Sequence, residues 1–166
     1  MDNILLLERI EEAKTAVFQK PEETMPEKLA AYLEAKQIKT YTHQAEAYDQ
    51  VSRGENIIVT TPTASGKTLS CLLPVFAKLL ENPDATVLLI YPTKALTRDQ
   101  LLTIQEMDSL LQAKTRPAIY DGDTKQEARA RIRTRSRIIL TNMYELHHIL
   151  PWRAKWGDFF ANLSFV

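Results

Sequence analysis

The residues best suited to chemistry are those from Thr61 to Thr68, which read Thr-Pro-Thr-Ala-Ser-Gly-Lys-Thr. A Gly-Lys-Thr sequence between an apolar strand and an apolar helix is typical of a phosphate-binding loop. In such a loop the backbone N–H groups surround the phosphates, the lysine reaches the outer phosphates and the threonine hydroxyl holds Mg²⁺. The pattern therefore predicts that Lys67 binds phosphate and that Thr68 is the Mg²⁺ ligand. Thr61 stands where the strict pattern has glycine, so the loop must turn without that freedom in φ.

The flanking residues favour this interpretation over an ordinary Ser/Gly turn with a solvated lysine. Residues 57–60 form a short apolar run that predicts a buried strand, and residues 69–73 open an apolar helix. Pro74 lies inside that helix, where its missing N–H predicts a kink or an early break.

Composition limits the classes of protein that remain. The 166 residues suggest one domain, and 45% hydrophobic residues are enough for a core. The 21 basic and 21 acidic residues balance, so a surface for nucleic acid must be local. The single cysteine, Cys71, excludes an internal disulfide and a cysteine-rich zinc site, and we expect it to pack in the helix. The run Leu5–Leu7 is too short for a signal peptide or a membrane span, which predicts a cytoplasmic protein without membrane contact.

The order of elements predicts an α/β fold. Helices are expected over residues 2–18, 26–36, with Pro26 in the first helical position, and 42–53. Short apolar runs, expected to be strands buried on both faces, follow at 57–60, 87–91, 117–120, 138–141 and 163–166. Helical stretches separate most of them, and this alternation predicts a parallel sheet flanked by helices.

Five short blocks are informative in combination: Tyr41-Thr42-His43-Gln44, the loop ending Gly66-Lys67-Thr68, Tyr91-Pro92-Thr93-Lys94-Ala95-Leu96, Tyr120-Asp121-Gly122-Asp123 and Thr141-Asn142. In this order and spacing the chain resembles the first RecA-like domain of superfamily 2 DEAD/DEAH-box helicases. Within that superfamily it is similar to the MrfA-type (YprA-type) DNA repair helicases, relatives of the RecQ-like group. The resemblance covers residues 26–166. It implies a P-loop NTPase (RecA-like) domain over 41–166, after an N-terminal helical extension over 1–40.

The resemblance implies an ATP-Mg²⁺ site. Gln44 matches a glutamine that reads adenine, because its amide offers one donor and one acceptor to the base edge; the alternative is a solvated residue at a helix start. Tyr41 either stacks on the base or belongs to the core. The phosphates are assigned to the loop residues Thr63, Ala64, Ser65, Gly66, Lys67 and Thr68.

The resemblance also implies a nucleic-acid interface. The residues that match it are Thr93, Lys94, Gly122, Thr141 and Asn142. The alternative for each residue taken alone is a helix cap or a turn residue. Together they favour one cleft, because open parallel sheets bind ligands beyond the carboxyl ends of their strands. DNA, single-stranded or forked, is the implied partner, and RNA is not excluded because backbone contacts carry little base information. Met143 stands where the relatives have proline, which puts the rigidity of that turn in question.

Two further features of the sequence have a plainer interpretation. Arginine occurs at 129, 131, 133, 135 and 137, and alternation around a helix predicts a mostly solvated surface, with one or two arginines reaching a phosphate. His147 and His148 are adjacent and point to different faces, which argues against a shared metal site.

The chain contains no Asp-Glu dipeptide. In the resembled family that pair belongs to the DEAH box, where Asp holds Mg²⁺ and Glu orients water, and a second RecA-like domain supplies arginines. We therefore expect the chain to stop short of the DEAH box of an ATP-driven 3′ to 5′ DNA repair helicase and to be inactive alone. The alternatives are a module that binds nucleotide or DNA without hydrolysis, and a small-molecule kinase sharing only the phosphate loop.

Overall fold

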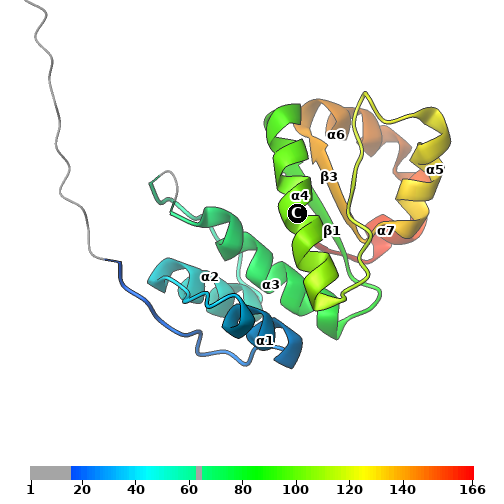
Figure 1. The fold of residues 1–166 in the computed structure, drawn as a ribbon. Helices are drawn as coiled ribbons and strands as arrows, with labels where there is room; N and C mark the ends of the chain where they lie inside the picture. Colours follow the sequence, from blue (N-terminus) through cyan, green and yellow to red (C-terminus); the bar gives the residue numbers. More distant parts are fainter. Residues whose placement is uncertain (1–15, 63–64) are drawn as a thin grey trace, which may run out of the picture.

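The computed structural model, which describes residues 16–62 and 65–166, has a parallel sheet between two groups of helices (Figure 1). The sheet order is β2-β3-β1-β4, and every pair is parallel. The strands are β1 (Thr86–Tyr91), β2 (Ala118–Ile119), β3 (Ile138–Asn142) and β4 (Leu163–Phe165). The helices are α1 (Glu27–Ala35), α2 (Thr42–Ser52), α3 (Lys67–Glu81), α4 (Lys94–Leu111), α5 (Gln126–Arg135), α6 (Met143–Ile149), the 3₁₀ helix η1 (Leu150–Trp156) and α7 (Gly157–Ala161). The predicted α/β class is confirmed.

The alternation of side chains along β1 and β3 divides the core in two. Val87 and Leu140 belong to the cluster formed with residues of α1, α2, α3 and α4. Leu88 and Ile139 point to the opposite face and pack in a cluster with Trp156 and other residues of η1, α6 and α7. Both faces are therefore covered, as expected for parallel strands made of continuous apolar residues.

Helix α3 passes through Pro74 and continues to Glu81, so the predicted early break does not occur. Pro74 is buried with the apolar face of the helix. Burial of that face stabilises the helix enough to offset the hydrogen bond that proline lacks. Cys71 is exposed, so the prediction that it is a packing residue of this helix is wrong.

The N-terminal region differs in part from expectation. Most of the helix predicted over 2–18 lies outside the described residues, but residues 16–18 are not helical, and Phe18 forms an antiparallel bridge with Tyr41. Helix α1 begins directly after Pro26, which is its N-cap and not its first residue. Leu29 of α1 is fully buried in the larger core cluster. The division of the chain at 40/41 stays a prediction.

The strand predicted over 57–60 is not formed, and Ile58 is 91% exposed. Among the described strands, β4 has β1 as its only neighbour. A groove of 810 Å³ is lined by Ile57 together with Tyr91 and Phe165. An apolar run becomes a strand only where a neighbour lies within hydrogen-bonding distance, and here the run borders a groove instead.

Over the same described ranges, no helix is long and apolar enough to cross a membrane.

Candidate nucleotide and nucleic-acid site

Gly66 joins the loop to the first turn of α3 in a conformation that excludes most other residues. Its φ is +80°, in the left-handed region. A Cβ built on it would lie 2.5 Å from Nε2 of Gln44. Position 66 therefore favours glycine for its backbone angle, and a side chain there would also have to displace the amide of Gln44.

Lys67, the first residue of α3, directs its ammonium group back over the loop. Its Nζ donates hydrogen bonds to the carbonyl oxygens of Thr61 and Pro62, both at 2.6 Å. These acceptors are neutral, so charged phosphate oxygens would be stronger partners for the same group. Thr68 follows on the first turn of the helix and is half-buried. The positions of Lys67 and Thr68 fit a phosphate and its Mg²⁺.

The hydroxyl groups of Thr61 and Ser65 link the two described ends of the loop. Oγ1 of Thr61 and Oγ of Ser65 lie 2.6 Å apart, within hydrogen-bonding distance. Thr61 is not among the described residues with positive φ, so its position does not require the freedom of glycine. Thr63 and Ala64, which were also assigned to the phosphates, lie outside the described residues.

Gln44 connects α2 to the loop and is 2% exposed. Its Oε1 accepts a hydrogen bond from the backbone N–H of Tyr41 at 2.9 Å, and its Nε2 donates to the carbonyl of Gly66 at 3.0 Å. One N–H and one lone pair of the amide remain for another partner. The adenine contact stays a prediction, and the structure adds a positioning contact between Gln44 and the loop.

Tyr41 lies within a short stack of rings. The ring of Phe18 is 5.0 Å away at 19°, and the ring of His43 is 5.7 Å away at 9°. Much of the Tyr41 ring surface is thus already in contact, whereas Phe18 is 50% exposed beside it. Phe18 could not be singled out from the local sequence, because the bridge between residues 18 and 41 is a tertiary contact.

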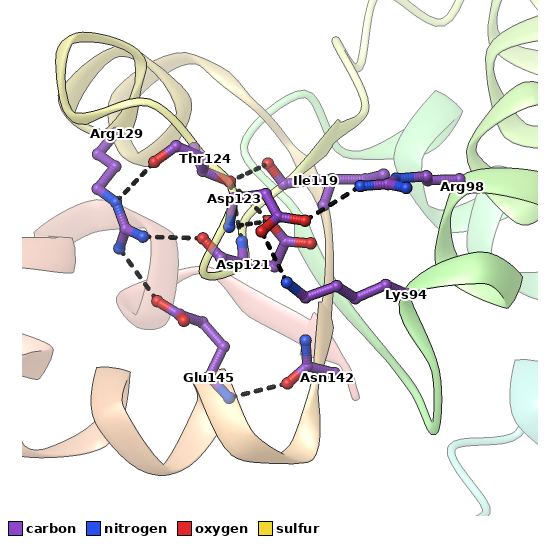
Figure 2. A network of polar contacts seen from close by, with 9 residues as sticks. All are labelled: Lys94, Arg98, Ile119, Asp121, Asp123, Thr124, Arg129, Asn142 and Glu145. Atoms are coloured by element: carbon purple, nitrogen blue, oxygen red, sulfur yellow. Dashed lines mark hydrogen bonds and ion pairs between the residues drawn. The ribbon is translucent and has the colours of Figure 1, made fainter.

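The second group of predicted residues gathers at the carboxyl ends of β1, β2 and β3. The register pairs Tyr91 with Asn142 and Ile119 with Leu140, so the three strands end at the same edge. A Cβ on Gly122 would lie 3.9 Å from Nζ of Lys94. The loops after these strands therefore meet, as Figure 2 shows for Lys94, Asp121 and Asn142.

Lys94 is bound to a carboxylate at this edge. Its Nζ lies 2.8 Å from Oδ1 of Asp123, and the guanidinium of Arg98 lies 3.1 Å from Oδ2 of the same side chain. The hydrogen bond from Lys94 lowers the pKa of Asp123 and raises the pKa of Lys94 itself. Neither Asp123 nor Arg98 was predicted as a site residue.

The three remaining predicted residues use their side chains within the fold. Oγ1 of Thr93 caps α4 by accepting from the N–H of Leu96 at 3.3 Å. Oδ1 of Asn142 caps α6. Thr141 is fully buried and donates to the Tyr120 carbonyl at 2.7 Å. Nucleic-acid contacts from these residues stay predictions, and only Thr93 and Asn142 present surface for them.

Arg129 of α5 holds the loop after β2 and the start of α6 together (Figure 2). Its guanidinium lies 3.0 Å from the carboxylate of Glu145 and donates to the carbonyls of Asp121 and Thr124 at 2.8 and 3.1 Å. It also lies over the ring of Tyr120, 4.8 Å from the centroid. This arrangement fixes the position of the loop that carries Gly122.

Of the other four alternating arginines, two are bound within the fold and two are exposed. Arg133 donates to the Tyr120 hydroxyl at 3.0 Å, and Arg137 donates to backbone carbonyls at the end of α3, whereas Arg131 and Arg135 are exposed. Helix α5 has no buried residue, in agreement with a mostly solvated helix, but the arginines at 129, 133 and 137 are half-buried and bound within the fold. They are spaced by four residues, and the first two share one side of α5.

Comparison with known proteins agrees with this geometry. Residues 41–166 match the DEAD/DEAH box helicase family. The chain is 38% identical over 146 residues to the uncharacterized ATP-dependent helicase YprA of Bacillus subtilis strain 168, covering 87% of this chain and 20% of YprA. It is 41% identical over 129 residues to the ATP-dependent helicase HRQ1 of Saccharomyces cerevisiae, covering 76% of this chain and 12% of HRQ1.

A solved structure extends the similarity to the fold. The crystal structure of the DUF1998 helicase MrfA bound to DNA and AMPPNP aligns with a TM-score of 0.86 and 37% identity, over 90% of this chain and 21% of the MrfA chain. The chain thus spans about a fifth or less of the length of these relatives. With a family match over most of its length and a RecA-like sheet in its structure, the chain belongs to the DEAD/DEAH box helicase family.

Proposed function

We propose that this chain binds ATP-Mg²⁺ and DNA as the N-terminal part of an ATP-dependent DNA helicase. The observation that carries the proposal is the ammonium of Lys67, held at 2.6 Å by two neutral carbonyls at the start of α3. Phosphate oxygens would replace those carbonyls with charged acceptors next to the positive end of a 15-residue helix. Thr68 would hold Mg²⁺, which would supply positive charge to offset the negative charge of the phosphates.

The DNA part of the proposal is supported by the meeting of three strand ends. Lys94, Thr93, Gly122 and Asn142 lie where a backbone can cross the edge of a parallel sheet. Such contacts fix a strand in position without reading its bases. The relative MrfA has been crystallised with DNA and AMPPNP together, which supports the same pair of ligands here. Movement from 3′ to 5′ and a role in DNA repair are proposed from the resemblance to MrfA-type helicases.

Hydrolysis is a separate question, and the sequence favours a second candidate function for these 166 residues. They contain no Asp-Glu dipeptide to hold Mg²⁺ and orient water. We therefore propose a nucleotide- and DNA-binding module that turns nothing over by itself.

The test combines binding with turnover. A fluorescent ATP analogue with Mg²⁺ is titrated into the chain, and phosphate release is measured with and without saturating single-stranded DNA. We expect saturable nucleotide binding and no phosphate release in either condition. Absence of nucleotide binding would contradict the ATP site, and release stimulated by DNA would contradict the non-hydrolysing module.

A further inference from the structure

Lys94 and Arg98 share one acceptor, the carboxylate of Asp123, at the edge where DNA binding is proposed. The two cations are four residues apart on α4, so they lie on one side of the helix. They contact different oxygens of Asp123, at 2.8 and 3.1 Å (Figure 2). We propose that Asp123 occupies the place of a backbone phosphate, that DNA must displace it, and that Arg98 is a second phosphate-binding residue. This inference rests on the proposed function.

The contact is of a kind that exchanges easily. The side chains of Lys94, Arg98 and Asp123 are 46%, 63% and 54% exposed. Ion pairs between exposed groups contribute little net free energy, because water and salt screen them. A backbone phosphate offers the same single charge on two non-bridging oxygens, and a guanidinium can bind both of them at once. Gly122 adds no side chain beside Lys94, so a backbone can approach the pair.

The loop that carries Asp123 does not depend on that carboxylate for its shape. Oδ1 of Asp121 accepts from the N–H of Asp123 at 2.9 Å, and Oγ1 of Thr124 accepts from the N–H of Asp121 at 2.9 Å. Arg129 binds the carbonyls of Asp121 and Thr124 from the other side. The substitution Asp123→Asn therefore removes one charge while the turn keeps its own hydrogen bonds.

The experiment measures binding of a labelled oligothymidylate to the 166-residue chain by fluorescence anisotropy over a range of salt concentrations. Asp123→Asn is expected to tighten binding about twofold to fivefold, the range that an exposed ion pair allows. The slope of the logarithm of the binding constant against the logarithm of the salt concentration should also become steeper by about 0.7. This is the change expected when one more cation neutralises a phosphate of a single strand. Arg98→Ala and Lys94→Ala should each weaken binding. In the Lys94→Ala background the gain from Asp123→Asn should shrink, because its partner is gone.

Asp99→Asn is the matched control. Asp99 is exposed on the same helix and follows Arg98 in sequence. Among the described residues its carboxylate accepts a hydrogen bond from the Gln100 amide at 3.4 Å and forms no ion pair. We expect no more than a slight change from this variant. Equal gains from Asp99→Asn and Asp123→Asn would overturn the inference in favour of a general charge effect.

The remaining outcomes separate the inference from the proposed function. If Lys94→Ala weakens binding but Asp123→Asn leaves it unchanged or weakens it, Asp123 is not a competitor and the DNA site stands. If neither the unsubstituted chain nor any variant binds, the DNA part of the proposed function fails and the inference fails with it. Circular dichroism melts of each variant confirm that a loss of binding is not a loss of fold.

Discussion

Two lysines in this chain begin helices at the sites proposed for phosphates, and they differ in what holds them. Lys67 is held by two neutral carbonyls of its own loop. Lys94 is held by the carboxylate of Asp123, which also binds Arg98. A phosphate gains a full charge interaction at Lys67, whereas at Lys94 it replaces a negative charge already present. Nucleotide binding should therefore depend strongly on one lysine, and DNA binding weakly on several groups.

The largest expected effect tests the first half of that contrast. Lys67→Ala should weaken binding of a fluorescent ATP analogue by about tenfold to hundredfold, since hydrogen bonds to charged groups contribute about 1.5–3 kcal/mol. Lys78→Ala is the control, because Lys78 is an exposed lysine on the same helix. Equal losses from the two variants would mean that the loop does not bind the phosphates.

The next effect concerns Arg129, which holds the loop after β2 at the edge where DNA binding is proposed. Arg129→Gln should destabilise the fold by about 1–3 kcal/mol, because it leaves the buried carboxylate of Glu145 without its charged partner. Arg131→Gln on the same helix changes an exposed side chain and should shift stability by no more than about 0.5 kcal/mol. Urea unfolding of both variants gives the comparison. Similar midpoints for the two would show that Arg129 does not hold the loop.

A smaller effect tests the close packing behind the nucleotide loop. Gly66→Ala and Gly54→Ala both place alanine at positive φ, +80° and +84°. A Cβ at position 66 also meets Gln44, whereas nothing lies within 4 Å of position 54. Gly66→Ala should therefore cost about 1 kcal/mol more than Gly54→Ala in the free energy of unfolding, a typical cost of overpacking. Equal costs for the two variants would show that the contact with Gln44 does not constrain position 66.

The smallest effect distinguishes base recognition from phosphate binding. Gln44→Ala should lower the affinity for ATP about threefold, because neutral hydrogen bonds contribute about 0.5–1.5 kcal/mol. This loss is smaller than the one expected for Lys67→Ala. GTP should bind more weakly than ATP, since guanine presents an acceptor where adenine presents a donor. Titrations with both nucleotides measure this. A loss at Gln44 equal to or larger than the loss at Lys67 would reverse the assignment.

The sequence predicted the fold class and most of the elements, because apolar runs such as 87–91 and 138–141 are buried on both faces of a parallel sheet. It failed at 57–60, where the composition suits a strand but the run pairs with none of the described strands. Periodicity reports how well a segment can be buried. It does not report which partner the segment finds.

The site was predicted less completely, for a related reason. Gly66 and Lys67 were predicted because the spacing of the phosphate-loop pattern carries its chemistry, and Gln44 was predicted from the resemblance to the helicases. Asp123 is 29 residues from Lys94, and Glu145 is 16 residues from Arg129. Nothing in the local pattern of charges distinguishes such pairs from solvated side chains, and only the meeting of the strand ends brings them together.

One crossed measurement tests the contrast between the two lysines most directly. Affinities for the ATP analogue and for single-stranded DNA are determined, each without the other ligand, for the unsubstituted chain, Lys67→Ala and Lys94→Ala. We expect Lys67→Ala to lose nucleotide binding and keep DNA binding, whereas Lys94→Ala should keep nucleotide binding and lose a modest, salt-dependent part of its DNA affinity. Parallel losses of both ligands in both variants would contradict the assignment of two separate phosphate sites.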